Sequence, residues 1–152
     1  MKAIHFIIFS FLLVDYSFAQ GDASRKKEFN LENGVALQGY DPVSYFQGKP
    51  IEGEDKIFYT FRGVNYHFSS STNRETFKAS PEKFEPAYGG WCAYAMGENG
   101  EKVKVDPETF KIVDGKLFLF YNFWGNNTLK SWNKNEPVLK ANADRHWQML
   151  TK

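Results

Sequence analysis

The chain of 152 residues contains a single cysteine, Cys92, so no disulfide can form within it. The chain also has no large excess of charge of either sign, because it contains 19 lysines and arginines and 18 aspartates and glutamates. A near-neutral balance gives no basic surface for nucleic acid and no acidic tail. No long apolar run follows residue 20, so we expect no membrane span in that part of the chain. A lone cysteine is left to be buried, metal-bound or paired between chains.

The one apolar run covers residues 3–14 and follows Lys2. Ser17-Phe18-Ala19 then places small residues at the −3 and −1 positions of a cut before Gln20, the layout of a secretory signal peptide. About a dozen apolar residues are fewer than the roughly 20 of a helical span. Asp15 argues against a retained anchor, and the absence of a cysteine at the cut argues against a lipoprotein. We therefore predict a signal peptide over 1–19 and an exported protein, either periplasmic or secreted.

The remaining residues suit one domain with one core. Residues 20–29 are polar and without periodicity, and we expect a flexible leader there, followed by a single domain over 30–152. Aromatic residues form 18% of the chain and should dominate the core. The aromatic side chains predicted to share one core are Tyr40, Phe68, Phe77, Trp91 and Tyr94.

Local patterns predict an α+β fold, a small antiparallel sheet with short helices packed around it. Alternating apolar residues indicate strands at 56–61, 64–68, 110–113 and 117–121. Arg62-Gly63 and Asp114-Gly115 should each connect two strands in a tight turn. Capping residues and prolines indicate helices at 74–79, from Pro81, at 126–132 and at 137–150. In the last helix, Val138, Ala141, Arg145 and Leu150 recur near helical spacing.

No complete catalytic set is visible, and we predict that the protein is not an enzyme. A serine or cysteine nucleophile needs a base held by a third group. Only His67 and His146 follow the signal peptide, and no serine lies in a Gly-x-Ser-x-Gly elbow. The lone pair Gly89-Gly90 lacks the other glycines and the lysine of a nucleotide-binding loop, and indicates close backbone packing instead.

Soft metal ligands are the main chemical candidates. Cys92 and Met96 are spaced i, i+4, which places thiolate and thioether on one face of a helix. His67 should point away from the side of the strand that carries Tyr66 and Phe68. Cys92, His67 and Met96 together suit Cu(I), or zinc without the methionine. The alternative is a buried cysteine, a gap-filling methionine and a surface histidine.

Asp41 lies between Tyr40 and Pro42, beside residues expected in the core. An aspartate before a proline favours an extended or turn conformation. We expect Asp41 to cap a turn, with lining of a pocket as the alternative.

Several segments together resemble the YHS domain family, most closely its small exported bacterial members. The segments that carry this resemblance are 39–46, 66–70, 73–77, 81–84, 88–96 and 113–117. They fit in order and spacing and cover nearly all of 30–152. Tyr66, His67 and Ser69 resemble the triplet that names the family.

YHS domains are similar to metal-binding TRASH-type modules and also occur attached to copper-transporting ATPases and to some monooxygenases. The resemblance therefore implies a metal role. Only Cys92 matches a cysteine position of those modules, whose cysteine-rich ligand pattern is absent here.

Two functions remain open at this point. The first is an exported binding module for a soft metal ion, copper or zinc, or for a small ligand. The second is a structural or protein-interaction domain without a small ligand, whose aromatic residues serve the core and one protein-facing patch.

We predict that the precursor is cleaved between Ala19 and Gln20, because small residues at −3 and −1 end an apolar run. N-terminal sequencing of exported protein should begin at Gln20. A product that still carries residues 1–14 would contradict a signal peptide.

Overall fold

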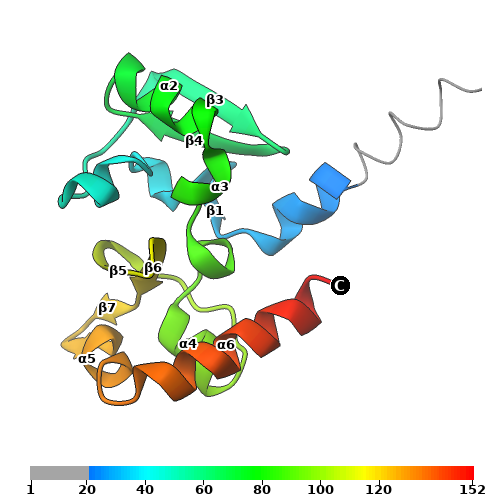
Figure 1. Cartoon of the computed structure of the whole chain (residues 1–152), viewed down its shortest axis with the longest axis vertical. Coiled ribbons are helices and arrows are strands. Elements are labelled where there is room, and N and C mark those ends of the chain that lie inside the picture. Colours follow the sequence, from blue (N-terminus) through cyan, green and yellow to red (C-terminus); the bar gives the residue numbers. More distant parts are fainter. Residues whose placement is uncertain (1–20) are drawn as a thin grey trace, which may run out of the picture.

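A computed structural model describes residues 21–152, which form an α+β fold. Two halves follow each other along the longest axis of the molecule (Figure 1), one built around β3 and β4 and the other around β5, β6 and the last helices. The predicted signal peptide, 1–19, lies outside the described residues. No helix in the described part of the chain is long and apolar enough to cross a membrane.

The first half contains a four-stranded mixed sheet in the order β1-β2-β4-β3. Its strands are β1 (Leu31–Glu32), β2 (Val35–Ala36), β3 (Glu54–Phe61) and β4 (Val64–Phe68). β3 and β4 form the predicted antiparallel hairpin, and its turn has φ of 46° at Arg62 and 80° at Gly63. β2 pairs in parallel with β4 through Val35 and Asn65. Short 3-10 helices at Leu37–Gly39 (η1) and Ser44–Gln47 (η2) precede β3.

Two predicted helices follow β4, and the first of them packs on β3 and β4. α2 (Ser71–Ala79) begins where the Ser70 hydroxyl accepts a hydrogen bond from the Asn73 amide at 3.1 Å. Such a cap satisfies one of the amides left free at a helix start. α3 (Pro81–Phe84) follows, with its proline in the first turn and Phe84 buried. Both predictions are therefore confirmed.

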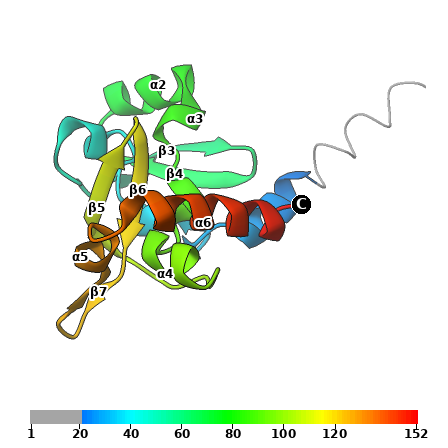
Figure 2. The ribbon, with the colours of Figure 1, turned by 60° about the horizontal axis from the view of Figure 1, so that its bottom comes forward.

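The second half contains two small hairpins and three helices, joined to the first by the 3-10 helix η3 (Ala87–Gly90). These elements are α4 (Ala93–Glu98), β5 (Asp106–Val113), β6 (Lys116–Phe120), β7 (Asn122–Phe123), β8 (Asn126–Asn127), α5 (Thr128–Trp132) and α6 (Glu136–Leu150). The turn Asp114-Gly115 joins β5 to β6 with φ of 50° and 71°, as predicted. Figure 2 shows α6 crossing in front of this half.

The buried face of α6 differs from the predicted one. Leu139 and Ala143 are its buried residues, whereas Val138 is 51% exposed and Leu150 is 42% exposed. The predicted face relied on Arg145, which the structure leaves exposed. Contact with α4 decides the orientation, because Gly97 packs so closely on Leu139 that an added Cβ would lie 2.5 Å from the Leu139 carbonyl oxygen.

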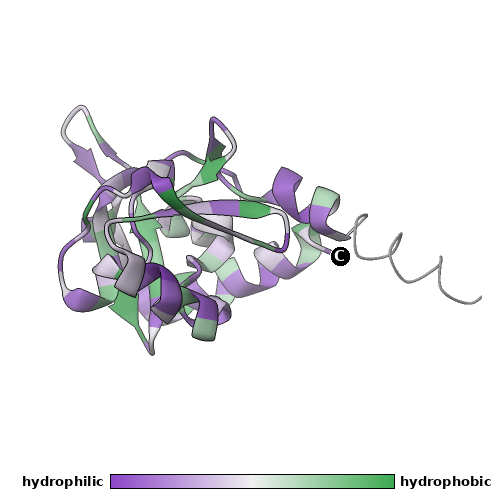
Figure 3. Ribbon diagram, turned by 90° about the horizontal axis from the view of Figure 1, so that it is seen from above, coloured by the Kyte–Doolittle hydropathy of each residue, from purple (hydrophilic) through white to green (hydrophobic). Residues whose placement is uncertain are grey.

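Two apolar clusters fill the interior. In Figure 3, hydrophobic and hydrophilic residues lie on the same strands and helices, as expected of elements that are buried on one side. Phe77 is the centre of the larger cluster, with the rings of Tyr59, Phe61, Tyr66, Phe68 and Phe84 around it. Tyr40 and Tyr94 pack against this cluster from its edge. The prediction was wrong for Trp91, which is half-buried and belongs to neither cluster.

The flexible leader predicted over residues 20–29 is also corrected, because residues 21–28 form a helix. The Trp91 indole donates to the Glu28 carbonyl at 2.7 Å, and the Lys102 ammonium pairs with the Glu28 carboxylate. Free carbonyls at a helix end need such donors. Tertiary contacts therefore hold a polar helix that has no apolar stripe of its own.

Asp41 is fully buried and caps a turn, as expected. Its Oδ1 accepts a hydrogen bond from the Val43 amide at 2.9 Å. Its Oδ2 accepts three more, from the amide and the hydroxyl of Ser69 at 2.9 and 2.7 Å and from the Asn73 side-chain amide at 2.7 Å. One carboxylate thus joins the start of η2, the end of β4 and the first turn of α2.

Replacing Asp41 with asparagine should destabilise the protein by about 2–4 kcal/mol. In either orientation, the NH2 group of the new amide would face N–H or O–H groups that now donate to the Asp41 carboxylate. Urea unfolding would measure the change. Ser69→Ala is the matched control and should cost less, about 1 kcal/mol, because three donors to the carboxylate remain. Equal stability of Asp41→Asn and the parent would contradict this role.

Candidate functional site

The three predicted metal ligands do not come together. His67 lies on β4 beside a cavity of about 360 Å³ in the first half, and its Nδ1 is 3.3 Å from the Asp55 carboxylate. Cys92 precedes α4, whereas Met96 lies within it. Both are fully buried, but in different apolar clusters, so they do not share the helix face expected from their spacing. Among residues 21–152, no group of three or more histidines, cysteines, aspartates or glutamates is placed to hold a metal ion.

The Cys92 thiol belongs to a closed ring of hydrogen bonds. Its sulfur accepts from the Tyr121 amide at 3.4 Å and lies 3.4 Å from the Thr128 hydroxyl. Thr128 donates its only hydroxyl proton to the Tyr121 carbonyl at 3.0 Å. The thiol must therefore be the donor to Thr128. Such an arrangement holds a protonated thiol as a structural link between the start of α4 and the end of β6.

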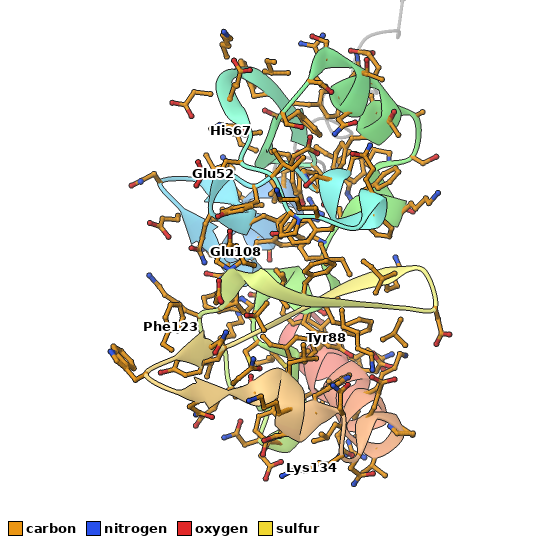
Figure 4. The ribbon with its side chains drawn as sticks, turned by 90° about the vertical axis from the view of Figure 1, so that its left-hand side faces the viewer. Glu52, His67, Tyr88, Glu108, Phe123 and Lys134 are labelled. Carbon is orange, nitrogen blue, oxygen red and sulfur yellow. The ribbon has the colours of Figure 1, made fainter. Side chains whose placement is uncertain are left out.

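A cleft of about 580 Å³ lies around Tyr88. Four segments border it: the N-terminal helix, residues 82–89, the turn between β5 and β6, and α6. Its aromatic walls are Phe29, Tyr88, Phe118 and Trp147, and its charged side chains are Arg25, Glu82, Glu85, Asp114, Lys116, Lys140 and Asp144. Its volume lies within the range of about 300–1,000 Å³ typical of ligand sites. Figure 4 shows Tyr88 in the half opposite to the one that carries His67.

The backbone at the base of this cleft is strained. Tyr88 has φ 53° and ψ 36°, a left-handed conformation that is uncommon for a bulky side chain. Gly89 and Gly90 continue the left-handed run with φ of 60° and 83°. A Cβ on Gly89 would lie 3.0 Å from the Trp147 ring and 3.1 Å from the Phe29 Cα. The predicted close packing at this glycine pair is therefore confirmed, and it holds the tyrosine in its unusual geometry.

A chain of hydrogen bonds fixes the polar end of Tyr88. Its hydroxyl donates to Asp144 Oδ1 at 2.9 Å, and the Lys140 ammonium donates to Asp144 Oδ2 at 3.1 Å. Burial, followed by the hydrogen bond to Asp144 and its charge, raises the pKa of Tyr88 above its ordinary value. The phenol therefore stays protonated at neutral pH, and the carboxylate beside it is held in place by donors on both sides.

A second polar network contributes Arg25 and Glu85 to the lining of the cleft. The Arg25 guanidinium pairs with the Glu85 carboxylate and donates to the carbonyls of Phe61 and Arg62 at 3.0 and 3.1 Å. Tyr66 donates its hydroxyl to the same carboxylate at 2.5 Å. Burial and the charge of Glu85 raise the pKa of Tyr66 well above its ordinary value. The N-terminal helix is thus attached to the sheet through the residues that line the cleft.

Sequence reasoning identified the glycine pair but not the cleft. Arg25, Tyr88 and Asp144 lie far apart in the chain, and none belongs to a catalytic or ligand motif. The one local signal was a tyrosine directly before two glycines, a pattern that allows a left-handed run.

Comparisons with known proteins do not extend this picture: no family model matches the chain, and neither does any curated protein or solved structure.

We predict that Cys92 resists alkylation in the folded protein, because its side chain is fully buried and its hydrogen-bond ring is complete. Iodoacetamide should modify it only after unfolding, at a rate that added Cu(I) or Zn(II) leaves unchanged. Cys92→Ala should cost about 1–3 kcal/mol by leaving the Tyr121 amide without its acceptor and the Thr128 hydroxyl oxygen without the thiol donor. Cys92→Ser, the control, should cost less. Rapid native modification that metal prevents would restore the metal-ligand interpretation.

Proposed function

We propose that the protein is an exported binding module of the YHS type that holds a small organic ligand in the cleft around Tyr88. The observation that carries this proposal is the cleft itself, a cavity of about 580 Å³ whose base is a strained tyrosine held on both sides. Backbone strain costs about 1–3 kcal/mol and persists where the surrounding structure imposes it, often at ligand sites.

The lining favours a ligand with a flat apolar body and polar ends. Four aromatic rings provide apolar area, and tyrosine and tryptophan also offer hydrogen-bonding groups. Three basic side chains, Arg25, Lys116 and Lys140, stand against four acidic ones. A nearly balanced site does not attract a polyphosphate, but it can pair with both ends of a zwitterion. An aromatic amino acid or a similar zwitterionic aromatic compound fits this chemistry.

Binding is better supported than catalysis. The residues that line the cleft include no cysteine, serine, threonine or histidine. A covalent mechanism of the serine or cysteine type would need such a nucleophile beside a base. The side chains that are present can orient a ligand and exclude water from it.

Copper or zinc binding by Cys92, Met96 and His67 would need a large rearrangement. Cys92 and Met96 are buried in the second half, whereas His67 is on the sheet of the first. The geometry therefore supports an organic ligand better than a soft metal ion. The remaining alternative is an interaction domain in which the cleft only separates packed elements.

Titration of the purified protein with tyrosine, tryptophan and phenylalanine, followed by amide chemical shifts, would test the proposal. We expect saturable shifts in residues 86–90 and 113–116. Asp144→Asn should weaken binding at least tenfold because it removes the carboxylate charge that Lys140 pairs with. Tyr88→Phe should do the same because it removes the hydroxyl that donates to Asp144. Tyr59→Phe is the matched control and should bind like the parent.

Native mass spectrometry of protein from its own compartment gives an independent readout. A co-purified small molecule that the Asp144→Asn variant loses would support the proposal. If no probe shifts the cleft residues and no small molecule co-purifies, the interaction-domain function takes its place.

A further inference from the structure

A second feature, remote from Tyr88, is the hairpin of β7 and β8. Its turn consists of Trp124 and Gly125, with φ of 50° and 79°. Two-residue turns of this type favour asparagine, aspartate or glycine at the first position, since a bulky side chain is strained there. Trp124 is nevertheless 94% exposed, and Phe123 beside it is 40% exposed. Figure 4 shows Phe123 at the edge of the second half.

This tryptophan contributes little to folding, because almost none of its surface is buried. Its left-handed backbone costs about 1–2 kcal/mol in comparison with a residue suited to the turn. Its ring lies 6.4 Å from Tyr121 and 6.1 Å from Phe123 between centroids, so the three rings form one group. Tyr121 packs against the larger cluster, whereas Trp124 is strained, exposed and does not serve the core. Such a tryptophan points to a contact outside the chain.

A small cavity of about 230 Å³ adjoins this group, and Tyr121 belongs to both. The polar and aromatic side chains that line it are Tyr94, Glu98, Asn99, Tyr121, Asn126 and Thr128. Asn126 pairs with Phe123 across the hairpin and is exposed to solvent. Partial burial and the neighbouring Glu98 carboxylate raise the pKa of Tyr94.

The charges of this region narrow the class of ligand. Residues 121–128 contain no charged side chain, and Glu98 is the one Asp, Glu, Lys, Arg or His side chain in the cavity wall. Single-stranded nucleic acid also stacks on aromatic rings, but it needs a basic groove. Anionic membranes attract aromatic surfaces that carry lysine and arginine, which are absent here. A neutral ligand rich in hydroxyl groups needs neither a basic groove nor nearby lysine and arginine side chains.

We propose that Trp124, Tyr121 and the adjacent cavity form a binding site for a neutral glycan. The negative face of an aromatic ring attracts the C–H hydrogens on one face of a sugar ring. The Asn126 amide and the Glu98 carboxylate then bind hydroxyl groups at the edge of the sugar, one as donor and acceptor and the other as acceptor. The exposed tip at Trp124 extends the platform beyond the cavity, so a chain of several sugars fits better than a monosaccharide.

Calorimetry and tryptophan fluorescence with four soluble probes would test this site: cellohexaose, xylohexaose, mannohexaose and chitohexaose. We expect saturable binding of at least one probe, with a blue shift of the emission as Trp124 leaves water. Trp124→Asn should weaken that binding at least tenfold, because it removes the platform, and Asn126→Ala should weaken it severalfold. Trp124→Asn should also melt at the same or a higher temperature, because asparagine suits the turn.

Phe58→Ala is the matched control, since Phe58 is an exposed aromatic residue on β3, 55% exposed and outside this cavity. It should bind the glycan like the parent. The proposal is overturned if none of the four probes binds, or if Trp124→Asn binds as well as the parent. It is also overturned if the emission shifts only with phosphatidylcholine or phosphatidylglycerol vesicles, which would make the tip a membrane contact.

Discussion

The ion pair between Arg25 and Glu85, with Tyr66 as a third partner, connects the parts of the molecule that would otherwise only touch. Arg25 comes from the polar N-terminal helix, Glu85 from the segment between the two halves, and Tyr66 from the buried face of β4. Arg25 also lies over the Phe29 and Phe61 rings at 4.4 and 5.5 Å, so its apolar stem and its charge are both used. Arg25, Phe29 and Glu85 also line the cleft at Tyr88. Loss of this network would therefore remove part of the lining of the cleft.

Two unusual tyrosine and tryptophan conformations distinguish the two proposed sites. Tyr88 is buried, and Gly89 packed on Trp147 holds its left-handed backbone from behind. Trp124 has a similar backbone at a hairpin tip where nothing covers it. The backbone strain at Tyr88 follows from the packing around a cavity, whereas no packing offsets the backbone strain at Trp124. The cleft therefore suits an enclosed small molecule, whereas the hairpin suits an extended ligand that approaches from outside.

Short-range signals in the sequence were sufficient for most of the elements. Asp114-Gly115 and Arg62-Gly63 produced the two predicted hairpins, and Ser70 capped α2, because turns and caps depend on a few neighbouring residues. Failures occurred where distant contacts decide. Residues 21–28 have no apolar periodicity, and contacts of Arg25 and Glu28 with distant residues hold them as a helix. The Leu139 face of α6 is buried because Gly97 has no side chain and lets α6 approach α4 closely. The cleft was not predictable for the same reason, since its walls come from four separated segments. The YHS resemblance and export remain predictions from the sequence.

Arg25 attaches the N-terminal helix to the sheet and thereby completes the cleft. Hydrogen exchange of the amides in residues 22–29 tests it most directly, with Arg25→Met compared with the parent and with Arg74→Met, whose ion pair with Glu75 lies on the exposed side of α2. We expect Arg25→Met to speed exchange at least tenfold in residues 22–29 while the amides of the β5–β6 hairpin keep their protection. Arg74→Met should leave both regions as they are. Unchanged protection of residues 22–29 in Arg25→Met would contradict the account.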